Sequence, residues 1–147
     1  MPRRSKSEEL LDFEITFYEK LFTAYPDFID VLTPLAEAYT RRGLHEKGLQ
    51  VDLRLAALRK DDPLAWYNLA CSYALLKRLD ESLEALRRAL TLGYADVTHL
   101  RSDPDLLNLR QSPKHRQVLH ALVALSAPKV YHGAHPGGSP QPPAHSP

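Results

Sequence analysis

The residues of this chain that could support catalysis or bind a metal are few, and their spacing does not bring them together. The single cysteine, Cys71, has no histidine near it in the sequence to act as the base that a nucleophilic thiol needs. His115 and His120 are five residues apart, whereas two metal ligands on one helix face are typically four apart. His132 and His135 lie in a segment rich in proline and glycine, which lacks the rigid frame of a metal site. We therefore expect no catalytic residues, no metal site and no cofactor.

The composition argues against several other classes of function. Of the 147 residues, 44% are apolar and 25% are charged, as in an ordinary globular domain. Nineteen basic residues balance eighteen acidic ones, so nucleic acid is not an expected partner. The sequence shows no signal peptide and no apolar run of membrane-spanning length, and a lone cysteine forms no internal disulfide. These features predict a cytoplasmic protein without a membrane or nucleic-acid partner.

Helix start and stop signals divide the first part of the chain into short antiparallel helices. The pair Ser5 and Glu8 has the spacing of a capping box at a helix start. Pro26 ends this helix, and Asp27 is predicted to cap the next one. Gly43 is suited to the left-handed backbone that closes a helix. The chain thus reads as helices joined by tight turns.

The same signals continue toward the C-terminus. A helix over residues 45–59 is expected to turn four apolar side chains toward the core: Leu49, Leu53, Ala56 and Ala57. Asp62 followed by Pro63 starts another helix. Asp103 and Ser112, each followed by proline, predict two further short helices. The last is expected to carry the apolar residues Val118, Leu119, Leu122 and Leu125.

Two segments repeat the same short pattern. Leu35–Tyr39 and Leu69–Tyr73 both read leucine, alanine, two variable residues and tyrosine, and they stand 34 residues apart. A fixed period of about 34 residues is typical of a repeated helix-turn-helix unit. We therefore expect an all-α fold of stacked helical hairpins.

The second copy resembles the tetratricopeptide repeat through five residues at scaffold positions: Trp66, Leu69, Tyr73, Leu86 and Ala89. The first copy departs from that pattern, since Leu32 takes the tryptophan position and Asp52 the position of Leu86. The N-terminal helix of the chain resembles the second helix of a repeat, and no first helix of that repeat precedes it in the sequence. Residues 100–113 are similar to the closing segment of many bacterial tetratricopeptide proteins, which covers the end of the stack.

This resemblance implies a domain over residues 5–125. Its expected parts are an unpaired helix over 7–25, repeats over 27–60 and 62–94, and a C-terminal cap over 96–125. From residue 126 to 147, proline, glycine, serine and histidine dominate, so we expect a disordered tail.

In the family, the first helix of each repeat lines a concave groove that binds protein segments, so the resemblance implies a non-catalytic protein-binding module. By position, the peptide-binding groove comprises ten residues: Asp30, Thr33, Glu37, Thr40, Arg41, Leu64, Tyr67, Cys71, Ala74 and Leu75. A partner with a hydrophobic anchor and a basic group would suit it, and Tyr67, Glu37 and Arg41 are the expected contacts. The alternative is that the C-terminal helices fold into the groove over Leu64 and Leu75.

Some members of the family grip a C-terminal carboxylate with asparagine, lysine and arginine side chains. Asn68 stands at one such position, but Glu37 occupies the equivalent place in the first copy and would repel a carboxylate. A carboxylate clamp is not expected.

The alternative function is a self-associating structural or chaperone-like subunit that uses the first helix. In that case Phe13 and Phe17, or Phe22 on the neighbouring stripe, would be left on the surface and support a homodimer. The sequence favours the other arrangement, in which Glu14, Glu19 and Lys20 form the solvated face and all the aromatic side chains point inward.

Overall fold

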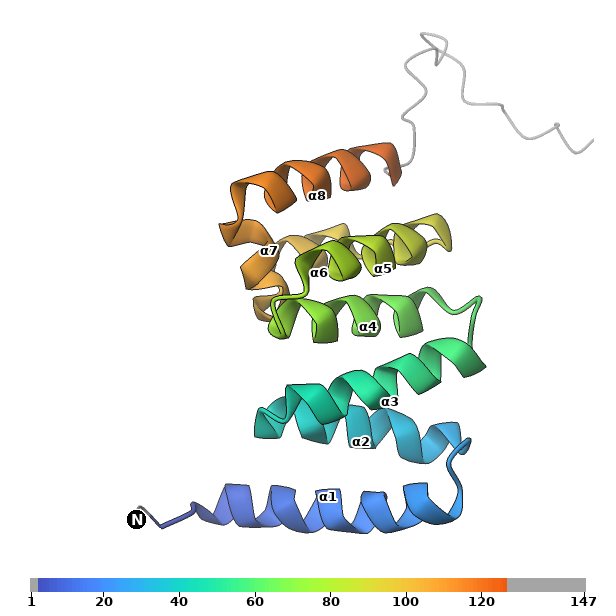
Figure 1. The fold of residues 1–147 in the computed structure, drawn as a ribbon, viewed down its shortest axis with the longest axis vertical. Helices are drawn as coiled ribbons and strands as arrows, with labels where there is room; N and C mark the ends of the chain where they lie inside the picture. Colours follow the sequence, from blue (N-terminus) through green and yellow to red (C-terminus); the bar gives the residue numbers. More distant parts are fainter. Residues whose placement is uncertain (1–2, 127–147) are drawn as a thin grey trace, which may run out of the picture.

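The computed structural model describes residues 3–126, and within them the chain forms eight α-helices, one short 3-10 helix and no β-strand. The expected all-α fold of packed helical hairpins is confirmed. The helices are α1 (Lys6–Ala24), α2 (Ile29–Arg42), α3 (His45–Leu58), α4 (Pro63–Leu75), α5 (Leu79–Thr91), α6 (Val97–Ser102), η1 (Pro104–Leu106), α7 (Leu107–Gln111) and α8 (Pro113–Ser126). They stack along the long axis of the molecule, with α1 at one end and α8 at the other (Figure 1).

Two of the predicted helix starts are present in full. The Ser5 hydroxyl accepts the Glu8 amide at 3.2 Å, and the Glu8 carboxylate accepts the Ser5 amide at 3.0 Å. The Asp62 carboxylate accepts the Leu64 amide at 2.9 Å at the start of α4. These bonds satisfy backbone amides that have no partner within the helix.

Two other expectations about helix starts are wrong. Phe28, not Asp27, is the N-cap residue of α2, and it makes no capping bond; the Asp27 carboxylate instead pairs with Arg54 of α3. Helix α6 was not expected. It begins after Asp96, whose carboxylate accepts the His99 amide at 3.0 Å.

The turns within the two hairpins have the same geometry. Gly43 has φ 79°, and the next amide, that of Leu44, donates to the Tyr39 carbonyl at 2.9 Å. One period later Lys77 has φ 60°, and the Arg78 amide donates to the Tyr73 carbonyl, also at 2.9 Å. The repeated tyrosines therefore stand at the same place in the two hairpins.

Two hydrophobic clusters hold the stack together. The smaller one joins α1, α2 and α3 around the fully buried Leu32 and Leu35. The larger one joins α3, α4 and α5 to the C-terminal helices around the fully buried Leu86, Leu100 and Leu106. Helix α3 contributes to both clusters, because Val51 and Leu55 belong to the first and Leu49 and Ala56 to the second.

Some apolar residues face away from these clusters, contrary to expectation. In α3, Leu53 and Ala57 are exposed, and the buried set is Gly48, Leu49, Val51, Asp52, Leu55 and Ala56. In α8, Leu119 and Val123 are buried, whereas Val118 and Leu125 are exposed. Helix α8 packs on α5 and α7 from one side only, so its opposite face has no neighbour within the described residues.

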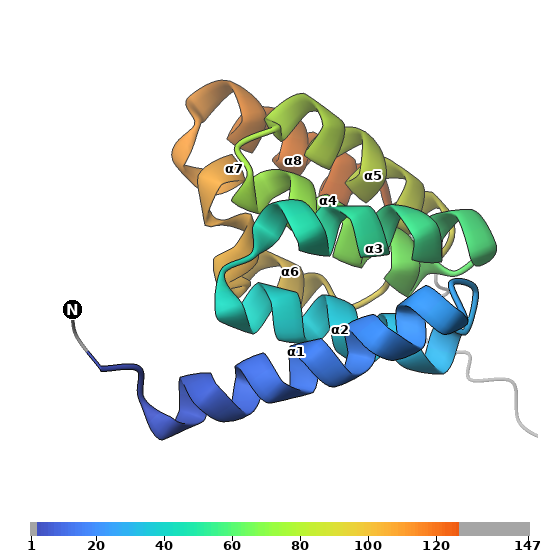
Figure 2. The ribbon, with the colours of Figure 1, turned by 60° about the horizontal axis from the view of Figure 1, so that its bottom comes forward.

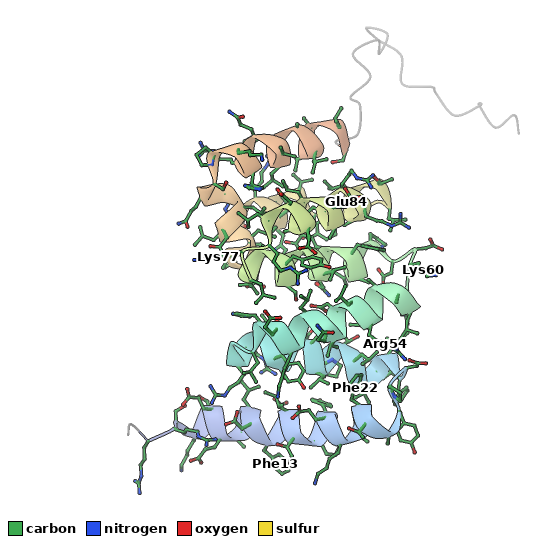
Figure 3. The ribbon with its side chains drawn as sticks, in the orientation of Figure 1. Phe13, Phe22, Arg54, Lys60, Lys77 and Glu84 are labelled. Atoms are coloured by element: carbon green, nitrogen blue, oxygen red, sulfur yellow. The ribbon has the colours of Figure 1, made fainter. Side chains whose placement is uncertain are left out.

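The expectation that all the aromatic residues of α1 point inward is also wrong. Tyr18 and Phe22 pack against the smaller cluster, but Phe13 is 72% exposed and Phe17 is 52% exposed. Phe13 projects from α1 on the side away from α2, whereas Phe22 lies on the side of α1 that faces the rest of the stack (Figure 3).

No helix among residues 3–126 is both long and apolar enough to cross a membrane. The predicted disordered tail, with His132 and His135, lies outside the described residues apart from Ser126, which ends α8.

Candidate peptide-binding groove

The residues assigned to the groove gather between α2 and α4. A hollow of about 440 Å³ is lined by eight of the ten: Thr33, Glu37, Thr40, Arg41, Leu64, Tyr67, Cys71 and Leu75. Asp30 lines an adjoining hollow of about 380 Å³, which shares Thr33 and Leu64 with the first. Ala74 is fully buried, and its carbonyl accepts the Asn108 side chain at 2.8 Å.

The segment after α5 crosses one part of this groove. The ring of Tyr94 stacks on that of Tyr67, with centroids 4.2 Å apart and planes 4° from parallel. The Tyr67 hydroxyl donates to Asp103 at 2.6 Å, and Tyr67 is only 3% exposed. Leu64, in contrast, remains 54% exposed. The C-terminal segment thus covers the groove at Tyr67 and leaves it open at Leu64.

Asp103 is the polar centre of this cover. Besides the Tyr67 hydroxyl, its carboxylate lies 3.1 Å from His99 Nε2 and 3.9 Å from the Cys71 sulfur, and it accepts the Asp105 amide at 3.0 Å. These bonds stabilise a buried carboxylate, which would otherwise be costly to remove from water. Asp103 therefore fixes the C-terminal segment to α4.

Cys71 is placed for packing rather than for nucleophilic attack. Burial, together with the charge of Asp103, raises the pKa of its thiol well above the ordinary value. A protonated thiol is a poor nucleophile and a poor metal ligand. Ligand atoms of Cys71, Asp103 and Asp105 lie within 4.8 Å of one another, a grouping that the sequence did not suggest. The hydrogen bonds to Asp103 account for this grouping.

A second buried carboxylate, Asp52, reaches the groove from α3. It is 4% exposed, and its carboxylate accepts the Ser72 hydroxyl of α4. Burial raises the pKa of Asp52 to about 6, while the bond from Ser72 acts in the opposite direction. Burial therefore shifts the pKa of Asp52 toward neutral pH.

The lining of the groove is predominantly acidic. Its carboxylates are Glu37, Asp52, Asp103 and Asp105, whereas its basic side chains are Arg41 and His99. Burial raises the pKa of Asp105, and the neighbouring Asp103 adds to the effect. Arg41 lies 3.3 Å from Glu14 of α1, so part of its charge is already balanced. An additional positive charge is the group that this lining would stabilise most.

A second hollow lies on the opposite side of the hairpins, between α3 and α5. It has a volume of about 560 Å³ and is lined mainly by apolar groups, including Leu53, Ala57 and Trp66. The Arg88 guanidinium lies over the Trp66 ring, 4.9 Å from its centroid. Figure 3 labels Lys60 and Glu84, which also line this hollow.

His115, whose spacing from His120 did not suit a metal site, has two polar partners in the structure. Its Nε2 lies 2.8 Å from the Asp80 carboxylate of α5, and its Nδ1 lies 2.6 Å from the Ser112 hydroxyl. The imidazole thus ties the start of α8 to α5.

The comparisons with known proteins agree with this geometry. Residues 63–92, which span α4 and α5, match the family model of the tetratricopeptide repeat. The chain is 36% identical over 80 residues to a chloroplastic protein of Arabidopsis thaliana, covering 50% of this chain and 23% of that protein. It is 24% identical over 83 residues to a TPR repeat-containing protein of Methanocaldococcus jannaschii, covering 56% of this chain and 14% of that protein.

The chain therefore spans less than a quarter of the length of either relative. Proteins of this family generally act as non-catalytic modules for protein–protein interaction. The match over residues 63–92, the 34-residue period and the stacked helices together support the identification of this chain as a tetratricopeptide repeat protein.

Proposed function

We propose that this protein binds a segment of another protein in the groove between α2 and α4, without catalysis and without a cofactor. The observation that carries the proposal is the open hollow of about 440 Å³, which eight of the positions assigned from the family pattern line together. A concave site that places charged and hydrogen-bonding groups beside an apolar contact such as Leu64 can bind a peptide segment specifically.

The bound segment should carry one basic side chain next to an apolar one. The carboxylates of Glu37, Asp52 and Asp105 face the hollow, so a lysine or arginine would find several acceptors there. Leu64 and Leu75 line the same hollow, and Leu64 keeps more than half of its surface exposed. An aliphatic anchor that covered Leu64 would supply affinity, and the basic group would set the register.

The remaining expectations belong to the same proposal. We place the two repeats at residues 27–60 and 62–94 within one domain over 5–125, which limited proteolysis would test. We also propose a cytoplasmic location, which cell fractionation would test.

The proposal is tested with an array of short synthetic peptides that pair lysine, serine or glutamate with a neighbouring leucine or serine. We expect the lysine–leucine peptides to bind best. Glu37→Lys and Leu64→Glu should each weaken their binding about tenfold or more, because both side chains are exposed at the hollow. Binding should also weaken with added salt.

Glu46→Lys is the matched control, because Glu46 is exposed on α3 and does not line the hollow. It changes the net charge as Glu37→Lys does and should leave binding intact. Equal loss in the two variants would show that only overall charge matters, and a preference for glutamate peptides would contradict the proposal. Tyr67→Ala is a poor probe, since Tyr67 is buried under Tyr94.

A further inference from the structure

Helix α1 presents a line of apolar side chains to solvent. Leu10 is 68% exposed, Phe13 is 72% exposed and Phe17 is 52% exposed. Their spacing of three and four residues places them on one face of the helix, opposite the face of Ile15 that packs against α2. We call Leu10, Phe13 and Phe17 the outer stripe of α1.

The position of α1 in the stack explains why this stripe is open. Helix α1 lies at the edge of the molecule next to α2 (Figure 2). In a stack of repeats, each helix pair leaves an apolar face that the next unit covers. No helix among residues 3–126 covers the outer side of α1, whereas α5 at the other side of the stack is covered by α8. Grouped exposed aromatic residues of this kind mark interaction surfaces.

We propose that the outer stripe of α1 binds the same stripe of a second copy of this chain. The pairing is an antiparallel helix pair with its two-fold axis between Phe13 and Phe17. In this arrangement Phe13 of each copy packs against Phe17 of the other, so the interface is formed by the same surface on both copies. This inference goes beyond the proposed groove, since α2 and α4 line the groove and the outer stripe lies on the far side of α1.

The charges beside the stripe select the antiparallel arrangement. Glu9 near the start of α1 and Lys20 near its end are both exposed, and neither is in an ion pair within the described part of the chain. Antiparallel pairing places Lys20 of one copy beside Glu9 of the second copy, twice per dimer. Parallel pairing would instead bring together the like ends of two helix dipoles.

The size of the stripe sets the expected affinity. Fully buried aromatic side chains contribute about 150–250 Å² each, and Phe13 and Phe17 are already partly covered, so two α1 helices would bury roughly 700–1,000 Å² in total, at the low end for specific interfaces. We therefore expect a reversible dimer with a dissociation constant of about 10–100 µM.

Sedimentation equilibrium over a range of concentrations tests the proposal on the full chain. The mass of the wild type should rise from 16.6 kDa toward twice that value as the concentration increases. Phe17→Glu should weaken dimerisation about 100-fold or more, because each substitution places a charge at two contacts of the symmetric interface. Leu125→Glu is the matched control, since Leu125 is an 84% exposed apolar residue on α8 at the opposite end, and it should dimerise like the wild type.

A charge exchange tests the orientation. Lys20→Glu should weaken the dimer about threefold to tenfold, and adding Glu9→Lys to the same chain should restore it. A wild type that stays monomeric throughout, or a dimer that survives Phe17→Glu, would overturn the proposal. Lack of rescue by the double variant would overturn the antiparallel arrangement. Circular dichroism of each variant verifies that it is folded, and groove binding by the monomeric variant separates this proposal from the proposed function.

Discussion

The two hairpins of this protein share a backbone plan but differ in how their second helices are packed. Hairpin α4–α5 carries Leu86, which is fully buried, and this hairpin matches the family model. At the equivalent place in hairpin α2–α3, 34 residues earlier, stands Asp52, which is also buried, at 4% exposed, but acidic. The same frame thus supports an apolar residue optimised for packing in one repeat and a carboxylate directed at the groove in the other.

This difference suggests that the two hairpins have different roles, the second in stability and the first in the chemistry of the groove. The second hairpin, with the C-terminal helices, forms the larger hydrophobic cluster and supplies most of the rigid frame. The first hairpin contributes Glu37 and Asp52 to the acidic lining of the groove. A buried carboxylate without a basic partner lowers stability, so its presence in the first hairpin is consistent with a role in binding.

The largest effect should come from truncating the packed residue of the second hairpin. Leu86→Ala removes a fully buried side chain and leaves a cavity, so the free energy of unfolding should fall by about 2–5 kcal/mol. Leu125→Ala, at an exposed leucine, should change it by less than about 0.5 kcal/mol. Urea unfolding followed by circular dichroism measures both. A loss below about 1 kcal/mol at Leu86 would show that this hairpin is not the tightly packed one.

The acidic residue of the first hairpin should make stability depend on pH. The pKa of Asp52 is raised from 3.8 to about 6 in the folded chain, so folding takes up a proton between these values. The free energy of unfolding contributed by Asp52 is therefore highest below about pH 4 and is lost as the pH rises through 6, by about 2–3 kcal/mol in total.

Comparison with Asp52→Asn isolates this contribution from that of the other carboxyl groups. The variant should gain stability relative to the wild type as the pH increases from 4 to 7, and the difference should be constant above pH 7. A difference that stays the same across the whole range would show that Asp52 keeps an ordinary pKa. Leu86→Met, which changes no titrating group, serves as the control.

Much of this frame could be predicted from the sequence, because it depends on local signals. The capping box at Ser5, the proline at the start of α4 and the glycine at the end of α2 each act within one turn of a helix. The 34-residue period then gives the register of one hairpin relative to the next. The groove positions of α2 and α4 followed from the same register, and eight of the ten line one hollow.

The rest could not be predicted, because it depends on contacts between distant segments. The cover over the groove rests on the bond from Tyr67 to Asp103, which are 36 residues apart. The inward or outward direction of Leu53 and Phe17 depends on which helices lie beside α3 and α1, and apolar spacing alone does not give that. Spacing around Asp52 did identify the departure from the family pattern, but not the Ser72 hydroxyl that bonds to it.

The starts of the two hairpins offer a smaller test of the same comparison. Asp62 caps α4 through the Leu64 amide, so Asp62→Ala should lower the free energy of unfolding by about 1 kcal/mol. Phe28 holds the equivalent position before α2, and Asp27, one residue earlier, caps nothing and forms only an exposed ion pair with Arg54. Asp27→Ala should therefore cost less than about 0.5 kcal/mol, and this loss should disappear in high salt. Equal losses at the two sites would mean that Asp27 caps α2 in solution.

The smallest effect concerns the turns, where the two hairpins differ in sequence but not in geometry. Lys77, labelled in Figure 3, has φ 60°, the left-handed conformation that Gly43 adopts one period earlier. A residue with a Cβ atom is disfavoured there, so Lys77→Gly should raise the free energy of unfolding by about 0.5–1 kcal/mol. Gly43→Ala should lower it by a similar amount, because a Cβ at Gly43 meets no atom within 4 Å and only the backbone preference is lost.

Thermal and urea unfolding of the two single variants and of the double variant measure these changes. Because the turns lie in different hairpins and share no contact, the two effects should add, leaving the double variant close to the wild type. A double variant as unstable as Gly43→Ala alone, in which Lys77→Gly adds nothing, would instead mean that the two turns are coupled through the stack. The two hairpins would then unfold as one cooperative unit. They would differ in the chemistry of their side chains but not in the stability of their turns.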